Sequence, residues 1–351
     1  MNTRVSTLLL LAAAAFSSCQ KDDDKTTDVT ALKKDILVNV STNVITASYT
    51  DMNNKATALA NAVTALESTT NDANLSAARQ AWKDMRVVWE QTEAWLYGPV
   101  SSEDIDPRID TWPVDFNALD AQLAGSAQFT AAYIDALPED LKGFHPIEYL
   151  LWGKDGSKTA AAFTAREKSY LQALTDNLVA LSKQVDDAWK TGYSTTFATA
   201  GQTGNSTYTS LQSAYLEMVA GMADICEEVA NGKMKDPFDA QDPNQEESPF
   251  AKNSITDFTN NIQGILKMYQ GDYNQSGVGL EDLVRNYNLS LDSDLKAAHA
   301  AAIAALNAIT VPFGQAITSQ QSQVQTAMAK INALHVVLQN QLQPFVQQYA
   351  K

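Results

Sequence analysis

Residues 75–97 read LSAARQAWKDMRVVWEQTEAWLY, and their hydrophobic spacing is that of an amphipathic helix. At 100° per residue, two tryptophans and two charged residues fall within one sector of roughly 60°: Trp82, Arg86, Trp89 and Glu93. Glu90 lies at the edge of this stripe. The pattern therefore predicts a helix whose buried face carries ions as well as aromatic rings.

Charged side chains on a buried face lose their hydration and need partners. One interpretation is a structural ion pair between Arg86 and either Glu90 or Glu93. The other is that both glutamates point toward a ligand while Arg86 braces them.

Helical spacing continues through most of the chain, and the β-branched residues are scattered at that spacing rather than gathered into strands. The other predicted helices cover residues 29–67, 117–123, 130–137, 160–189, 208–234, 249–270, 280–287, 291–310 and 318–349. The polar, Gly- and Thr-rich segment 192–206 is the best candidate for a domain boundary. We expect an all-α fold of two packed helical bundles, residues 30–192 and 206–351.

The sequence Gly143-Phe144-His145-Pro146-Ile147-Glu148 places a histidine three residues before a glutamate. If Pro146 is the first helical residue, His145 is the N-cap and Glu148 the third helical position. Residues three apart share a helix face, so imidazole and carboxylate can converge on one metal ion. The helix dipole favours an ionised Glu148. The alternative is a capping role for this glutamate.

An acidic segment precedes this motif and is expected to be an ordered loop, because Pro107, Trp112 and Pro113 stiffen it. Its acids are Glu103, Asp104, Asp106, Asp110 and Asp115. Their spacing does not fit an EF-hand. A second long loop is predicted at 235–248. His299 and His335 have no acidic neighbour at ligand spacing and are interpreted as structural.

The first residues have the features of an export signal: Arg4, an apolar run over 8–16, and Ser17-Ser18-Cys19. We predict a lipoprotein signal peptide over residues 1–18, a lipid on Cys19, and a disordered tether over 19–29. The expected location is the cell envelope, on the periplasmic or surface face of the outer membrane. An ordinary soluble signal peptide is the alternative.

The net charge of −16 over 351 residues argues against nucleic acid as a partner. Removing residues 1–18 takes away one arginine and no acid, which gives −17. A cation is a plausible partner for such a chain. With lipid on Cys19, Cys226 is the only remaining thiol, so the sequence has neither a disulfide framework nor a Cys-rich metal site.

Several blocks of this sequence resemble the imelysin-like family. Residues 143–148 match its GxHxxE motif, and residues 82–93 with Gly98-Pro99 are similar to its first block. Residues 108–114 look like the next block, and residues 247–250, Asp257 and 262–271 like the later one. The likeness covers roughly residues 30–350, and the ordered set is more specific than the short motif.

The resemblance implies two packed helical bundles, export to the envelope, a link to iron-regulated uptake, and a site where the bundles meet. His145 and Glu148 would be the motif pair that binds the metal. Their expected acidic companions are Glu90, Glu93, Asp106 and Asp110, and the expected surrounding or pocket residues are Arg86, Trp112, Ser248 and Asp257. Ala251 departs from the family pattern, which often has serine there.

The leading hypothesis is a metal-binding lipoprotein that serves iron uptake together with other envelope proteins. One imidazole and several carboxylates without thiolate favour iron or manganese, with zinc or copper able to compete. Free iron and an iron complex are both candidate ligands. We expect four side chains to approach one point: Glu90, Glu93, His145 and Glu148.

Two alternatives remain open. A metallopeptidase usually presents HExxH, whereas only one histidine lies near this site. A Ser248–His145–Asp257 hydrolase can be written down, but no glycine-flanked nucleophile elbow surrounds the serine. The other alternative is a non-metal ligand receptor or scaffold, with tryptophans stacking on sugars or aromatic ligands.

Overall fold

A computed structural model describes residues 29–351. The predicted signal peptide, Cys19 and nearly all of the predicted tether lie outside the described residues. Within 29–351 every regular element is helical and no strand is present, which confirms the predicted fold class. No helix in this part of the chain is both long and apolar enough to cross a bilayer.

The first half contains ten α-helices, several of them only one or two turns long. They are α1 (Thr30–Asn39), α2 (Ala47–Ser68), α3 (Asp72–Thr92), α4 (Pro99–Ser102), α5 (Ile105–Asp110), α6 (Phe116–Ala124), α7 (Ala131–Asp135), α8 (Phe144–Trp152), α9 (Ala165–Ala188) and α10 (Ser194–Ala198). A π-helical segment, Val40–Thr46, joins α1 to α2 as one continuous rod, as the pattern over 29–67 predicts.

The second half is built in the same way. Its helices are α11 (Leu211–Glu228), α12 (Lys235–Ala240), α13 (Ser254–Gln270), α14 (Leu280–Tyr287), α15 (Leu289–Asn307), α16 (Phe313–Ser319), α17 (Gln321–Val337) and α18 (Gln343–Tyr349). Further π-helical segments extend α9, α11 and α17: Trp189–Tyr193, Val229–Lys233 and Leu338–Leu342. Short 3-10 turns occur at Glu93–Trp95, Glu139–Leu141, Ala160–Ala162 and Pro243–Gln245.

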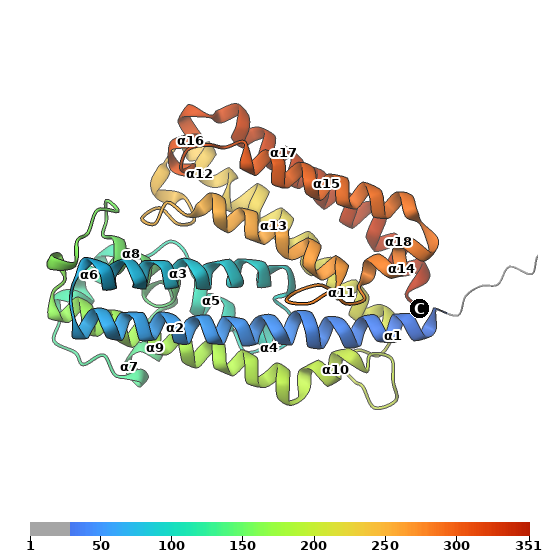
Figure 1. Cartoon of the computed structure of the whole chain (residues 1–351), viewed down its shortest axis with the longest axis horizontal. Helices are drawn as coiled ribbons and strands as arrows, with labels where there is room; N and C mark the ends of the chain where they lie inside the picture. Colours follow the sequence, from blue (N-terminus) through green and yellow to red (C-terminus); the bar gives the residue numbers. More distant parts are fainter. Residues whose placement is uncertain (1–28) are drawn as a thin grey trace, which may run out of the picture.

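Two layers of long helices make up the molecule (Figure 1). One layer contains α1, α2, α3 and α9, and the other contains α11, α13, α15 and α17. Helix α2 packs against α3 and α9, and α15 packs against α17. Helix α13 contacts both α3 and α15, so the layers meet along α3 and α13. The division at 192–206 into separate domains stays a prediction.

Close contact between α3 and α13 depends on a small residue. A Cβ on Gly264 of α13 would lie 2.3 Å from the carbonyl oxygen of Gln91 on α3, which is closer than real atoms approach. The interior faces of the two helices are filled by large side chains, including the fully buried Trp82, Trp89 and Phe258. The aromatic part of the predicted stripe is therefore core, as its spacing indicates.

Three segment predictions were wrong in detail. The acidic stretch after Gly98-Pro99 holds the short helices α4 and α5, and the predicted loop 235–248 holds α12 and a 3-10 turn. The predicted final helix is broken at Gln320, whose φ of −132° and ψ of 43° are not helical. Pieces of one or two turns are too short to show a periodic pattern, so packing decides their conformation.

Candidate metal site

His145 lies inside helix α8, which begins before Pro146. The N-cap is Gly143, with φ 84° and ψ −158°, so the predicted N-cap role of His145 is wrong. A Cβ at Gly143 would lie 2.1 Å from the carbonyl oxygen of Ile109. Only glycine accepts both this backbone conformation and this approach. The contact sets the start of α8 directly against the end of α5, where Asp110 lies.

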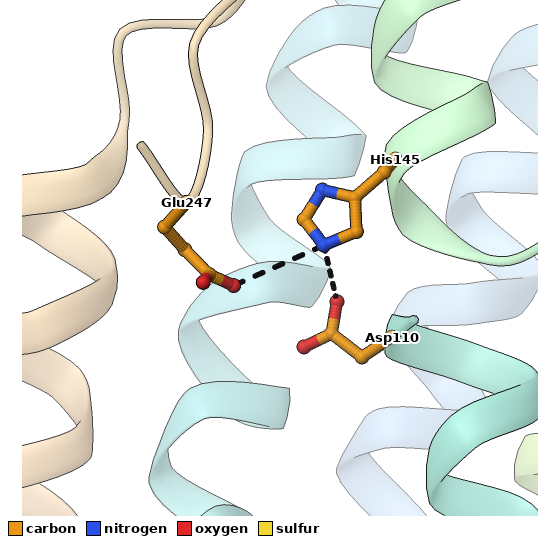
Figure 2. Close-up of side chains that lie close together, drawn as sticks. All are labelled: Asp110, His145 and Glu247. Atoms are coloured by element: carbon orange, nitrogen blue, oxygen red, sulfur yellow. Dashed lines mark ion pairs between the residues drawn. The ribbon is translucent and has the colours of Figure 1, made fainter. Parts of the chain in front are cut away.

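Three side chains from distant parts of the chain converge beside this contact (Figure 2). Asp110 ends α5, His145 is on α8, and Glu247 lies between α12 and α13. One potential ligand atom of each lies within 4.8 Å of the others. His145 Nε2 is 3.1 Å from Asp110 Oδ1 and 3.9 Å from Glu247 Oε1. The two carboxylates thus face the same ring nitrogen.

The imidazole of His145 is fully buried, and neither ring nitrogen makes a well-aligned hydrogen bond to any residue in 29–351. Its Nδ1 is 3.8 Å from Glu148 Oε2, and the ring of Trp112 lies 4.7 Å away between centroids. Burial alone would lower the pKa of His145, but the neighbouring carboxylates of Asp110 and Glu148 raise it to about 9. The ring therefore carries a proton at neutral pH when no metal is bound.

Arg86 is the permanent cation at the centre of the cluster. Its guanidinium, on α3, is fully buried and pairs with four carboxylates: Glu90, Asp110 at 2.5 Å, Glu247 at 2.7 Å and Asp257 at 3.5 Å. Burial raises the pKa of Asp110, yet the Arg86 charge outweighs this and holds that pKa well below its usual range. The indole of Trp89 also donates to Asp110 Oδ2 at 2.6 Å.

Glu148 is fixed by the backbone of the other layer. Its Oε1 accepts a hydrogen bond of 2.7 Å from the backbone N–H of Ala251, while its Oε2 has no hydrogen-bond partner in the described chain. Burial raises the pKa of Glu148, against the lowering effect of His145. With Gly143 as the N-cap, Glu148 lies beyond the first turn of α8, where the expected influence of the helix dipole has fallen off. Ala251, where a hydroxyl was expected from the family pattern, acts through its backbone.

Glu90, on α3, and Glu93, at the start of the 3-10 turn that follows it, lie against Lys233 and Asn261. The Asn261 amide donates to Glu90 Oε2 at 2.7 Å and to Glu93 Oε2 at 2.5 Å. Burial raises the pKa of Glu90 to about 7, and burial with the Glu90 charge raises that of Glu93 well above its usual value. Among the described residues, the side chains whose ligand atoms lie within reach of one ion are Asp110, His145 and Glu247. The metal-binding role expected for Glu90, Glu93 and Glu148 stays a prediction.

A cavity of about 280 Å³ reaches this cluster from outside. Asp110 and Glu247 belong to its lining, together with Glu93, Asp106, Trp112, Glu228, Lys233 and Asp236. Burial raises the pKa of Asp106 to about 6. Asp106 and Trp112 therefore line the approach to the cluster, whereas Asp110 is part of the cluster itself.

Ser248 and Asp257 also lie close to the cluster, but they do not form a catalytic triad with His145. The Ser248 hydroxyl donates to Asp257 Oδ2 at 2.6 Å, and Asp257 Oδ1 accepts from Asn253 at 2.7 Å. No hydrogen bond between Ser248 and His145 is present in the described structure. His299 Nε2 lies 3.1 Å from the carbonyl oxygen of Ile262, away from the cluster.

Sequence reasoning missed two residues of this site as candidate functional groups. They are Glu247 and Lys233. The sequence places Glu247 in a family block without indicating its role, although it contacts both Arg86 and His145. The signal for Glu247 was its place beside Ser248 in that block; we find none for Lys233, which ends a π-helical segment that leaves no trace in the hydrophobic pattern.

The fold and the site together define an all-helical protein with two helix layers and a buried cluster of one imidazole and several carboxylates near the contact between them. Comparison with known proteins agrees with this class. Residues 45–341 match the family model described as Imelysin. The chain belongs to the imelysin family.

Individual relatives support the same assignment. The chain is 31% identical over 314 residues to iron-regulated protein A of Synechococcus elongatus, covering 87% of this chain and 84% of that protein. A crystal structure of a candidate iron-regulated protein A precursor from Parabacteroides distasonis has a TM-score of 0.82 and 25% identity, covering 92% of this chain and 95% of that one. An imelysin-like protein from Psychrobacter arcticum, at 14% identity, shares the fold with a TM-score of 0.72 and covers 90% and 96% of the two chains.

Proposed function

We propose that this protein binds one divalent metal ion through His145, Asp110 and Glu247, and that it serves iron uptake. The observation that carries the proposal is a fully buried imidazole whose Nε2 faces two carboxylates from other elements, with neither ring nitrogen in a well-aligned hydrogen bond among the described residues. In the metal-free protein the ring is charged and its Nε2 pairs with Asp110 at 3.1 Å, so an ion placed between them would replace the imidazole proton. A metal ion accepts the lone pair of the neutral ring.

The charge balance of the cluster supports a cation. Six carboxylates are buried around two permanent positive charges, Arg86 and Lys233; they are Glu90, Glu93, Asp110, Glu148, Glu247 and Asp257. The carboxylates outnumber the permanent positive charges, and burial raises the pKa of Glu148 and Asp257, so keeping these groups ionised without water around them is costly. A divalent ion would offset that excess.

The presence of Arg86 is compatible with a metal. Each carboxylate oxygen has two lone pairs, so Asp110 Oδ1 and Glu247 Oε1 can accept a guanidinium N–H and still bind an ion. Hydrogen bonds of this kind, made to a ligand by a residue that does not bind the metal, hold the ligand in its orientation and change its affinity for the metal. Oxygen ligands with a single imidazole favour iron and manganese over softer metals. The name of the Synechococcus relative, iron-regulated protein A, supports iron as the physiological metal.

The envelope location completes the proposal and comes from the sequence. The signal pattern before Cys19 supports a lipid anchor that would hold the protein at the outer membrane, where incoming iron passes. A hydrolase is less well supported, because Ser248 donates to Asp257 rather than contacting His145. The proposal therefore concerns binding and delivery of a metal rather than catalysis.

Titration of the chelator-treated protein tests the proposal. We expect calorimetry with Mn²⁺, or with Fe²⁺ without oxygen, to give one ion per chain, reversed by EDTA. Excess Mg²⁺ in the buffer should leave the binding in place, since it competes for exposed acids but poorly for an imidazole. Absence of saturable binding of both ions would contradict the proposal.

A further inference from the structure

Lys233 lies in a cage of carboxylates beside the candidate metal site. It is the last residue of the π-helical segment that extends α11, and its side chain is 11% exposed. Its Nζ is 3.1 Å from both carboxylate oxygens of Glu93, 3.4 Å from Glu228, 3.6 Å from Glu247 and 3.9 Å from Glu90. A single ammonium group thus stands among four acids.

The surroundings of this ammonium are those of a hard metal ion. The acidic atoms around Nζ are carboxylate oxygens, and their residues come from the end of α3 and the turn after it, the end of α11 and the segment before α13. Such a set suits manganese, iron or magnesium. The ammonium itself demonstrates that the cage holds a cation.

Glu247 connects this cage to the candidate metal site. The same atom, Oε1, lies 3.9 Å from His145 Nε2 and 3.6 Å from Lys233 Nζ. A carboxylate between two cation positions is the arrangement that bridges paired metals. The ammonium therefore lies where the second cation of such an arrangement would be.

We infer that Lys233 is a built-in cation that limits the site to a single metal ion, and that a neutral side chain at this position would open the carboxylate cage to a second divalent ion. This inference rests on the proposed function of the first position. Access is provided by the cavity, whose lining includes Lys233, Glu93 and Glu228. A second ion would be held by carboxylates alone, with Glu247 shared through its other oxygen, because Oε1 already accepts from Arg86 and faces the first position.

The test is the Mn²⁺ stoichiometry of Lys233→Met, which keeps the length of the side chain and removes its charge. We expect two ions per chain in the variant and one in the wild type, with an electron paramagnetic resonance spectrum that shows coupling between the two ions. Lys235→Met is the matched control, because its partly exposed ammonium pairs only with Asp239 among the described residues, and it should bind one ion. One ion or none in Lys233→Met, beside one in the wild type, overturns the inference.

Two further measurements keep the result decisive. Removing the ammonium leaves the carboxylates unbalanced, so metal-free Lys233→Met should melt below the wild type, and Mn²⁺ should raise its Tm by more than it raises that of the wild type. An equal or smaller rise counts against the inference. The double variant Lys233→Met/His145→Ala should retain one ion. If the wild type binds none, the proposed function fails, whatever the number for the variants.

Discussion

Arg86→Met is expected to lower the free energy of unfolding by about 3–5 kcal/mol, the typical cost of removing one partner from a buried ion pair. The guanidinium is fully buried and lies against Glu90, Asp110, Glu247 and Asp257. Methionine fills much of its volume but leaves these acids without their main counter-charge. Urea denaturation followed by circular dichroism, on metal-free protein at pH 7, measures the loss.

Arg108→Met is the matched control, because its ion pair with Asp135 is partly exposed, at 23% and 57%. Exposed pairs contribute about 0–1 kcal/mol, so the free energy of unfolding of this variant should stay near that of the wild type.

The difference in free energy of unfolding between Arg86→Met and the wild type should become smaller at acidic pH. The pKa of Asp110 is lowered in the folded protein, so its stabilising contribution is present at neutral pH and lost as pH falls through that pKa. A change below about 1 kcal/mol in Arg86→Met would contradict a central role for the guanidinium.

His145→Ala is expected to weaken Mn²⁺ or Fe²⁺ binding by more than about 100-fold, because loss of even an outer-shell partner costs about 10–100-fold. The matched control is His335→Ala, whose ring is 16% exposed and lies 3.9 Å from Glu227, away from the cluster. Calorimetric titration of each purified variant, after a melting curve that verifies folding, gives the affinities. Equal loss in both histidine variants would contradict the assignment.

The pH dependence of binding provides a second readout for His145. Its pKa is raised to about 9, so a metal ion must displace a proton at neutral pH. Wild-type affinity should therefore rise about tenfold per pH unit from 7 to 9 and then level off. The stability of the metal-free protein changes in the opposite direction. The raised pKa of His145 contributes to the free energy of unfolding; this contribution is fully present below about pH 6.5 and is lost as the pH rises through 9.

Much of the helical architecture could be predicted from the sequence because it follows from local periodicity. The stripe of Trp82, Arg86 and Trp89 indicated both the helix and its buried face, and all three side chains are fully buried. An ion pair between Arg86 and Glu90 was one of the two interpretations of that stripe, and it is present. Residues one turn apart determine these features, so no tertiary information is needed.

The composition of the cluster could be predicted only in part, because it depends on contacts between distant segments. Arg86 and Glu247 are 161 positions apart in the sequence, and no local pattern relates them. The start of α8 depends on the approach of Gly143 to Ile109, so the N-cap expectation failed although the shared face of His145 and Glu148 survives. The position of Lys233 depends on where the π-helical segment Val229–Lys233 ends, and no local sequence pattern indicates that end.

The most direct test of the account is a crystal structure of the protein soaked with Mn²⁺, with anomalous differences collected near the manganese absorption edge. We predict one strong peak within bonding distance of His145 Nε2, Asp110 and Glu247, with Arg86 still hydrogen-bonded to the two carboxylates. A protein that shows saturable binding in solution but has its peak elsewhere, or that shows no peak at this cluster, would contradict the central claim.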